Sequence, residues 1–401
     1  MELLDKYLNY WPVLAGTLVF FVLAWVLYLR GERAMERSAK DVSWIRAYRK
    51  EGWPMRPEVL AFKPRHWLIF AGLGLFGAAA SVGYRVLSGE IFLQDTASLL
   101  LTRYTVFAAL VSAFGAVAAG LLLQTLFDDT LVLVMGSLLL SASSLCSHPA
   151  LCLLTGAVWL LVCYLRTEAP ELKQELLYYG SVLLLALTLS IQPQNFWLIL
   201  VWIGLHVYKN AWLLHHNRQT AGLLWGKLGL AVLIWAVSVV ALLAWRYAML
   251  QNFSARMLLR VLKPTVLLRA LSTTARMALE GAVQPLMRSR LLYPMMDAPL
   301  FGLGVFGAVS ALRMVAKRRN VRGIVALAAL CVLALAWILN AKYLVTLGVV
   351  LTGACLLKNC RIGRCGRSAL LVSLAGLVWY VALYLAAAYL PLADELIIRL
   401  S

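Results

Sequence analysis

The chain has 401 residues, of which 62% are hydrophobic and 14% charged, and its formal net charge is +19. Soluble domains contain only about 45–50% apolar residues, whereas this chain is divided into apolar runs close to the length of about 20 residues that crosses a bilayer as a helix. The composition therefore excludes an ordinary soluble protein and predicts an all-α, multi-pass membrane protein. We expect the positive charge to lie mainly in cytoplasmic loops and not to bind nucleic acid.

The first apolar run, Trp11–Leu29, predicts a retained transmembrane helix, because no small-residue cleavage site accompanies it. The next stretch, 30–65, is dense in arginine and lysine, which places it in the cytoplasm and the N-terminus outside. Trp44, Tyr48 and Trp53 are interspersed among these bases. This pattern favours a segment that lies on the headgroups of an anionic leaflet, and a solvated linker is the alternative.

A short polar segment separates the predicted spans Trp67–Leu87 and Tyr104–Leu126. It contains Glu90, Asp95 and Arg103, in a chain that has only 18 acidic residues. The orientation set by the basic loops puts this segment at the extracytoplasmic edge of the membrane. It is the first candidate for a functional site.

Nine further apolar runs bring the expected number of spans to about twelve. They cover residues 131–145, 150–165, 176–191, 196–208, 228–250, 300–316, 323–339, 343–357 and 368–390. The first two of these runs are short for full spans, so they are expected to be tilted or to end beneath the outer surface beside a cavity. Every predicted inner loop is basic except the turn at Asp128 and Asp129, which supports the orientation.

The segment 251–298 is predicted to lie outside, yet it is basic. Arg256, Arg260 and Lys263 are spaced at i, i+4 and i+7, which puts them on one face of a helix. We expect one or two amphipathic helices in the outer interface, where such side chains can bind phosphate oxygens. The alternatives are that these helices bind only anionic lipid headgroups, or that the region locally enters the membrane.

These features divide the chain into four parts. They are the first span with its basic cytoplasmic segment (1–66), a transmembrane module (67–250), the basic outer segment (251–298) and the C-terminal helices (299–401).

Three patterns in order along the chain are Gln94-Asp-Thr-Ala-Ser-Leu-Leu-Leu-Thr-Arg103, Leu126-Phe-Asp-Asp129 and Gln192-Pro-Gln194. Together they resemble the GT-C class of membrane glycosyltransferases, over about residues 67–210. In that class an acid follows an early span, commonly as Asp-Glu-Ala-x-x-Leu in the first outer loop, and a short inner turn and a polar outer turn come later. This chain departs from the class in two ways: Asp95 is followed by threonine, and His148 stands where a second acid is often found.

The resemblance implies a transfer of sugar from a polyprenyl-phosphate-type lipid donor to an acceptor on the extracytoplasmic side. Asp95 would be the catalytic base that takes the proton of the acceptor hydroxyl. The residue has a simpler explanation as the N-cap of a helix that starts at Thr96, and one side chain can do both. The implied partners are membrane lipid and the lipid-linked sugar, and the expected location is the plasma membrane of a bacterium.

The departing phosphate needs cations or a metal to stabilise its charge. The cofactor is unknown, and a divalent metal is left open. The residues assigned to substrate binding share a polar side chain at the predicted outer side: Glu90, Arg103, His148, Gln192, Gln194, Arg256, Arg260 and Lys263.

Two other functions stay open. One is a non-catalytic membrane scaffold or assembly protein with a GT-C-like fold, for which 30–65 would be the surface that docks a protein partner. The other is a lipid flippase or transporter. Lys209 and Lys227 are assigned to a cytoplasmic loop, which leaves almost no ionisable residue deep in any span, and this argues against ion-coupled transport.

Overall fold

The structure, a computed structural model, describes residues 11–38, 63–87, 98–143, 149–166, 172–191, 198–216, 219–250, 298–317, 323–338 and 342–389, with 265, 268, 269 and 272. Within these residues there are twelve helices and no strand. The helices are α2 (Trp11–Ser38), α4 (Pro64–Leu87), α5 (Ser98–Phe127), α6 (Thr130–Ala142), α7 (Pro149–Arg166), α8 (Leu172–Ile191), α9 (Leu198–His215), α10 (Ala221–Leu250), α14 (Ala298–Lys317), α15 (Gly323–Ile338), α16 (Lys342–Ile362) and α17 (Gly366–Tyr389).

The prediction of an all-α membrane protein is confirmed for the described residues. Seven of their helices, α2, α4, α5, α7, α10, α14 and α16, are long and apolar enough to cross a membrane. A helix satisfies its own backbone hydrogen bonds, and the hydrocarbon offers no other partner. Long runs of leucine, alanine and valine therefore fold as helices here. The run at 150–165 was expected to be short, but α7 reaches spanning length.

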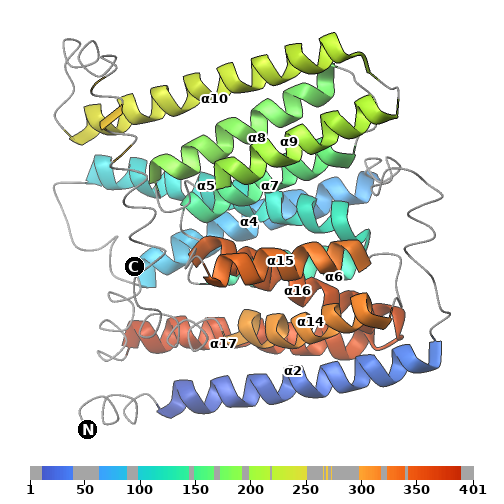
Figure 1. Cartoon of the computed structure of the whole chain (residues 1–401). Helices are drawn as coiled ribbons and strands as arrows, with labels where there is room; N and C mark the ends of the chain where they lie inside the picture. Colours follow the sequence, from blue (N-terminus) through green and yellow to red (C-terminus); the bar gives the residue numbers. More distant parts are fainter. Residues whose placement is uncertain are drawn as a thin grey trace, which may run out of the picture.

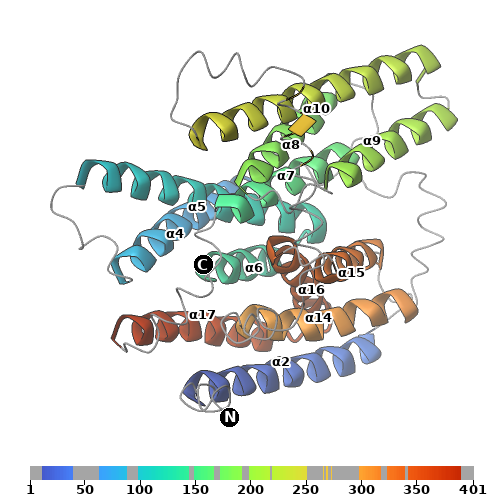
Figure 2. The same ribbon diagram turned by 60° about the vertical axis from the view of Figure 1, so that its left-hand side comes forward.

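The helices lie roughly side by side in one bundle (Figures 1 and 2). At one edge α2 packs on α14, and α14 packs on α16. In the middle α5 contacts α4, α6 and α7, and α7 packs on α8. At the other edge α10 contacts α8 and α9. The termini of the twelve helices alternate between the two ends of the bundle, as in an antiparallel membrane protein (Figure 1).

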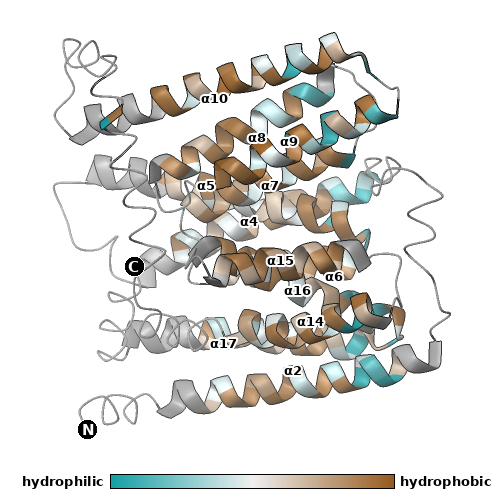
Figure 3. Ribbon diagram, viewed as in Figure 1, coloured by the Kyte–Doolittle hydropathy of each residue, from teal (hydrophilic) through white to brown (hydrophobic). Residues whose placement is uncertain are grey.

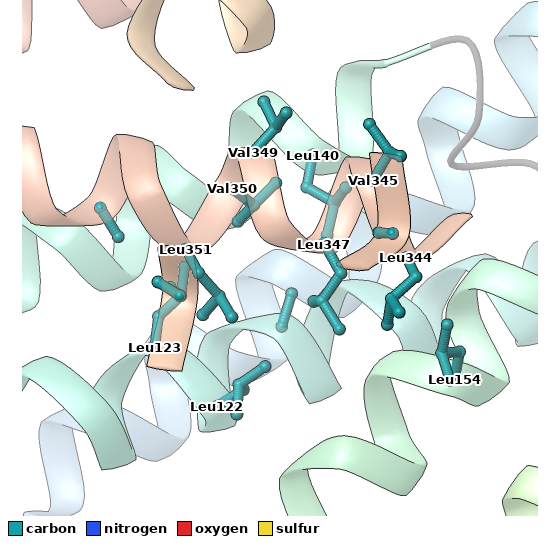
Figure 4. Close-up of a cluster of buried hydrophobic side chains, with 14 of the residues drawn as sticks. Leu122, Leu123, Leu140, Leu154, Leu344, Val345, Leu347, Val349, Val350 and Leu351 are labelled. Carbon is teal, nitrogen blue, oxygen red and sulfur yellow. The ribbon is translucent and has the colours of Figure 1, made fainter. Parts of the chain in front are cut away.

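The centre of the bundle is α16. In the apolar part of α16, 83% of the residues are buried, whereas in the apolar part of α10 only 22% are buried. Helix α10 therefore presents most of its surface to lipid. Figure 4 shows Leu344, Leu347 and Leu351 of α16 near Leu122 and Leu123 of α5, Leu140 of α6 and Leu154 of α7. These leucines are 0–6% exposed. The central core thus joins the C-terminal helices to the first half of the chain.

Three ion pairs among the described residues connect neighbouring helices at one end of the bundle. Lys358 Nζ lies 3.0 Å from Asp129 Oδ2, and Arg313 lies 3.2 Å from Glu32. Lys227 Nζ lies 2.9 Å from Glu175 Oε1. Figure 3 shows hydrophilic residues gathered at this end, at the right of the view. We call it the polar end. It contains the turns whose basic composition predicts a cytoplasmic location.

Asp129 holds the start of α6 at the polar end. One carboxylate oxygen accepts the backbone N–H of Leu131 at 3.0 Å and lies 3.5 Å from the backbone nitrogen of Val132. The other oxygen pairs with Lys358. A short acceptor at this position satisfies N–H groups that have no partner inside the helix. Asp129 therefore caps α6 and fixes it to α16.

We expect Asp129→Ala to cost more stability than Asp129→Asn. The asparagine keeps an acceptor for the Leu131 N–H and loses the ion pair, whereas the alanine loses both, and a lost N-cap costs about 1 kcal/mol. Thermal unfolding of the purified protein in detergent should rank the wild type first, Asp129→Asn second and Asp129→Ala last. Equal melting temperatures for the two variants would show that the cap contributes nothing.

Candidate functional site

The side chains assigned to catalysis and substrate binding fall outside the region that can be described. Glu90, Asp95, His148, Gln192, Gln194, Arg256, Arg260 and Lys263 lie outside the described residues. Arg103 lies in the second turn of α5, at a position where only the backbone is described. Most of the segment 30–65 also lies outside. The roles assigned to these residues stay predictions, and the structure describes what surrounds them.

The helices that flank the Asp95 segment are described. It follows the end of α4 and precedes the start of α5, and both of these lie at the end of the bundle opposite the polar end, at the left of Figure 1. The two helices pack closely, because a Cβ on Gly77 would lie 2.8 Å from the Ser112 carbonyl oxygen. The end of α4 and the start of α5 therefore lie away from the basic turns.

Helix α6 is too short to cross a membrane. It has 13 residues, which at 1.5 Å per residue gives about 20 Å, against about 30 Å of hydrocarbon. It begins at the polar end, where Asp129 pairs with Lys358, and it is about 10 Å shorter than the hydrocarbon is thick. This confirms that the run at 131–145 falls short of a full span. Backbone that ends a helix inside the hydrocarbon must be covered by protein or line a water-filled cavity.

A buried polar network occupies the other half of the bundle, between α7, α8 and α9. Tyr164 of α7 and His206 of α9 are 0% and 1% exposed, and the tyrosine hydroxyl lies 2.9 Å from His206 Nδ1. The ring of Tyr178 on α8 stacks on the His206 ring with 4.1 Å between centroids. Asn210 Nδ2 donates to the Tyr164 hydroxyl at 3.2 Å. The Tyr164 hydroxyl thus connects α7 to both His206 and Asn210 of α9.

Indole groups extend the network to α10. Trp235 Nε1 donates to the Tyr178 hydroxyl at 3.1 Å, and Trp202 Nε1 donates to Ser181 Oγ at 3.1 Å. Both tryptophans and Ser181 are buried. Since α10 makes few other contacts with the bundle, the Trp235–Tyr178 bond and the Glu175–Lys227 pair position it against α8.

Two buried cations bind the C-terminal ends of neighbouring helices. Lys209 Nζ donates to the Tyr164 carbonyl near the end of α7, and it lies 3.7 Å from the centroid of the Tyr164 ring. Arg166 donates to the Thr125 carbonyl near the end of α5. The last four carbonyls of a helix lack partners within it, and that end carries partial negative charge. The Thr125 carbonyl therefore stabilises Arg166, and the carbonyl and ring of Tyr164 stabilise Lys209.

The prediction that Lys209 and Lys227 lie in a cytoplasmic loop is wrong. Helix α9 extends to His215 and α10 begins at Ala221, so both lysines lie within helices, where they are 2% and 8% exposed. A charge predicts a loop only when nothing in the bundle can pair with it. The sequence does hold a signal of the burial, because His206, Lys209 and Asn210 are spaced at i, i+3 and i+4 on one face of a helix.

Comparison with models of known protein families, with curated proteins and with solved structures finds no match. Among the described residues, no group of three or more histidine, cysteine, aspartate and glutamate side chains is arranged to hold a metal ion. The assignment to the GT-C class therefore stays a prediction made from the sequence pattern.

Proposed function

We propose that this chain is a GT-C-type glycosyltransferase of a bacterial plasma membrane, with the polar end in the cytoplasm and about twelve spans in total. It would move a sugar from a polyprenyl-phosphate-type donor to an acceptor at the opposite end of the bundle. The observation that carries the proposal is the short helix α6, enclosed by α4, α5, α14, α16 and α17. The helix is about 10 Å shorter than the hydrocarbon, and backbone that ends a helix inside the membrane is tolerated beside a water-filled cavity, which would suit a lipid-linked substrate.

The proposed chemistry uses Asp95 as the base that accepts the proton of the acceptor hydroxyl while the anomeric carbon is attacked. The bond from the sugar to phosphate breaks, and the polyprenyl phosphate leaves with its negative charge. Arg103 and the basic residues Arg256, Arg260 and Lys263 would stabilise this charge, since guanidinium and ammonium groups bind phosphate oxygens. Glu90, His148, Gln192 and Gln194 would orient the sugar and the acceptor.

Asp95→Asn is expected to lower the rate of sugar transfer by at least about 100-fold, the usual contribution of a positioned base. The purified protein in liposomes is supplied with polyprenyl phosphates that each carry a different radiolabelled hexose or pentose, and the release of free polyprenyl phosphate is measured. Asparagine keeps the shape and the capping ability of the side chain, so folding should be unchanged.

Asp128→Asn is the matched control, because it removes a carboxylate at the polar end. Asp128 has a φ of 48° and accepts a hydrogen bond from Gln124 at 3.0 Å. Asparagine tolerates this backbone conformation and keeps the acceptor, so this variant should keep the full rate. Equal rates for Asp95→Asn and the wild type, or no release from any donor by the wild type, would contradict the proposal.

A transporter is the second candidate, favoured by the buried charges of Glu175, Lys209 and Lys227. Ionisable residues inside a membrane bundle commonly mark the path of an ion or substrate. The carbonyl and carboxylate contacts of these groups explain their burial without transport. Measurable flux of lipid or solute through liposomes containing Asp95→Asn at the wild-type rate would favour this candidate over the enzyme.

A further inference from the structure

The turn between α16 and α17 brings two cysteines together. It is a Schellman motif, in which two backbone hydrogen bonds close the end of a helix. The N–H of Cys365 donates to the Cys360 carbonyl at 2.7 Å. The N–H of Arg364 donates to the Arg361 carbonyl at 3.2 Å, and Arg364 has a φ of 60°, in the left-handed region that the motif uses. Cys360 and Cys365 therefore occupy the two positions whose side chains commonly contact each other across such a turn.

The hydrogen bond between Cys365 and Cys360 limits the distance between their Cα atoms. The Cys360 Cα lies about 2.4 Å from its own carbonyl oxygen, and the Cys365 Cα lies about 1.5 Å from its own nitrogen. Since the oxygen and the nitrogen are 2.7 Å apart, the two Cα atoms are at most about 6.6 Å apart. Disulfides usually join Cα atoms about 4.4–6.8 Å apart. The turn therefore has the right size for a disulfide, although both thiols are free in the structure.

Both sulfur atoms face helix α2. Cys360 Sγ donates to the Leu27 carbonyl at 3.8 Å. Cys365 Sγ donates to the Arg30 carbonyl, also at 3.8 Å. Leu27 and Arg30 are three residues apart and so lie on one side of α2. A Cβ on Gly31 would lie 2.9 Å from Cys360 Sγ, so this glycine leaves room for the sulfur. The two thiols thus hold α2 against the turn.

The two thiols differ in exposure. Cys360 is 0% exposed, whereas Cys365 is partly exposed. A soluble oxidant reacts with the thiol that it can reach, so Cys365 should react first. Cys360 is then the resolving thiol, because the turn holds it beside Cys365. An accessible thiol next to a resolving cysteine is the arrangement typical of redox sensors.

We propose that Cys360 and Cys365 form a reversible disulfide that releases α2 from the turn. The Cys365 thiolate attacks one sulfur of a small-molecule disulfide, and the other half leaves as a thiolate. The Cys360 thiolate then attacks the Cys365 sulfur of the mixed disulfide, and the second half leaves as a thiolate. In total, two protein thiols are oxidised and one small-molecule disulfide is reduced to two thiols, which take up the two protons of the cysteines.

The disulfide changes what holds the C-terminal part of α2. Neither sulfur carries a proton once the bond has formed, so both S–H donors to α2 are lost. An S–S bond of about 2.05 Å also requires the sulfurs to turn toward each other. The polar end is proposed to be cytoplasmic, where disulfides are usually transient and redox-sensing. A reversible bond is therefore the form that fits this location.

Mass spectrometry of the purified full chain tests whether the disulfide forms. The protein is incubated in detergent with glutathione disulfide, the remaining thiols are alkylated, and the chain is digested with trypsin. Trypsin cuts after Arg361 and Arg364, which separates the two cysteines into different peptides. The peptides 359–361 and 365–367 should be recovered joined to each other, and dithiothreitol should separate them. Absence of the joined peptides would overturn the proposal.

Three single variants test the order of the steps. Cys360→Ala should stop at the mixed disulfide and carry glutathione on Cys365, whereas Cys365→Ala should leave Cys360 without glutathione. The matched control is Cys355→Ala, because Cys355 is also five residues from Cys360 but lies inside α16. Five residues of helix rise about 7.5 Å, which exceeds the disulfide range, so this variant should form the disulfide as the wild type does. Equal glutathione on Cys360 in Cys365→Ala and on Cys365 in Cys360→Ala would overturn the assigned order.

Hydrogen exchange measures the release of α2. The N–H groups of residues 31–34 bond to the carbonyls of residues 27–30 within the helix. They should exchange about fivefold faster in the oxidised wild type than in the reduced wild type, as expected when two weak hydrogen bonds are lost. Exchange in α5 should stay the same, and dithiothreitol should reverse the change. Equal exchange of residues 31–34 in both forms would show that the disulfide does not release α2.

Discussion

Gly307→Leu is expected to abolish the packing of α14 on α16. A Cβ on Gly307 would overlap the carbonyl of Thr352 and would lie 2.8 Å from the backbone nitrogen of Gly353. The obstacle is backbone, which cannot rotate away as a side chain can. Overpacking usually costs about 1–3 kcal/mol, and we expect this substitution to reach or exceed the upper value because two helices must separate.

Gly229→Leu is the control for Gly307→Leu. Gly229 lies on α10, and a Cβ there would meet nothing within 4 Å, so leucine should be accommodated at the lipid-exposed surface. Melting temperature and the fraction of monodisperse protein in detergent report the difference. A Gly307→Leu protein that melts within a few degrees of Gly229→Leu would show that α14 and α16 do not approach as closely as described.

Lys227→Met is expected to destabilise the protein by about 3–5 kcal/mol, the cost of leaving one member of a buried ion pair without its partner. The side chains of Lys227 and Glu175 are 8% and 10% exposed, so water cannot replace the lost contact. Glu175→Gln/Lys227→Met removes both charges and should recover most of the stability. Denaturant titration of the wild type, the single variant and the double variant measures the recovery.

Arg313→Met provides the comparison. Arg313 pairs with Glu32 at 3.2 Å, but its side chain is 45% exposed. Exposed ion pairs contribute only about 0–1 kcal/mol, and removing a half-exposed arginine lets water reach Glu32. If Lys227→Met costs no more than Arg313→Met, the Glu175–Lys227 pair is hydrated and the buried description of this region is wrong.

The sequence predicted the helices well where lipid determines the outcome. The run predicted at 300–316 is the helix Ala298–Lys317, and the run at 67–87 is the helix Pro64–Leu87. A long apolar segment in a bilayer has no folded alternative that satisfies its backbone, so composition is sufficient. The sequence also predicted that α6 is short, because the apolar run that begins at residue 131 is soon interrupted by the serines that follow Ala142.

The same reasoning failed at Lys209, because hydropathy evaluates each residue separately. Whether a lysine can be buried depends on its partners, and here these are the carbonyl and the ring of Tyr164, 45 residues earlier in the chain. The local spacing of His206, Lys209 and Asn210 marks a polar helix face, but it does not identify these partners. The Asp95 site has a related difficulty: Asp95, His148 and Arg256 are far apart in the sequence, and no local pattern fixes their positions relative to one another.

The contacts of Arg166 and Lys209 impose an order on biosynthesis. Thr125 near the end of α5 gains its side-chain donor only when α7 is in place, and Tyr164 near the end of α7 gains its own only when α9 arrives. A ribosome delivers these helices in that sequence. In these two cases a later helix therefore completes the terminus of an earlier one, and a nascent chain arrested ahead of α9 would lack the Lys209 donor to the Tyr164 carbonyl.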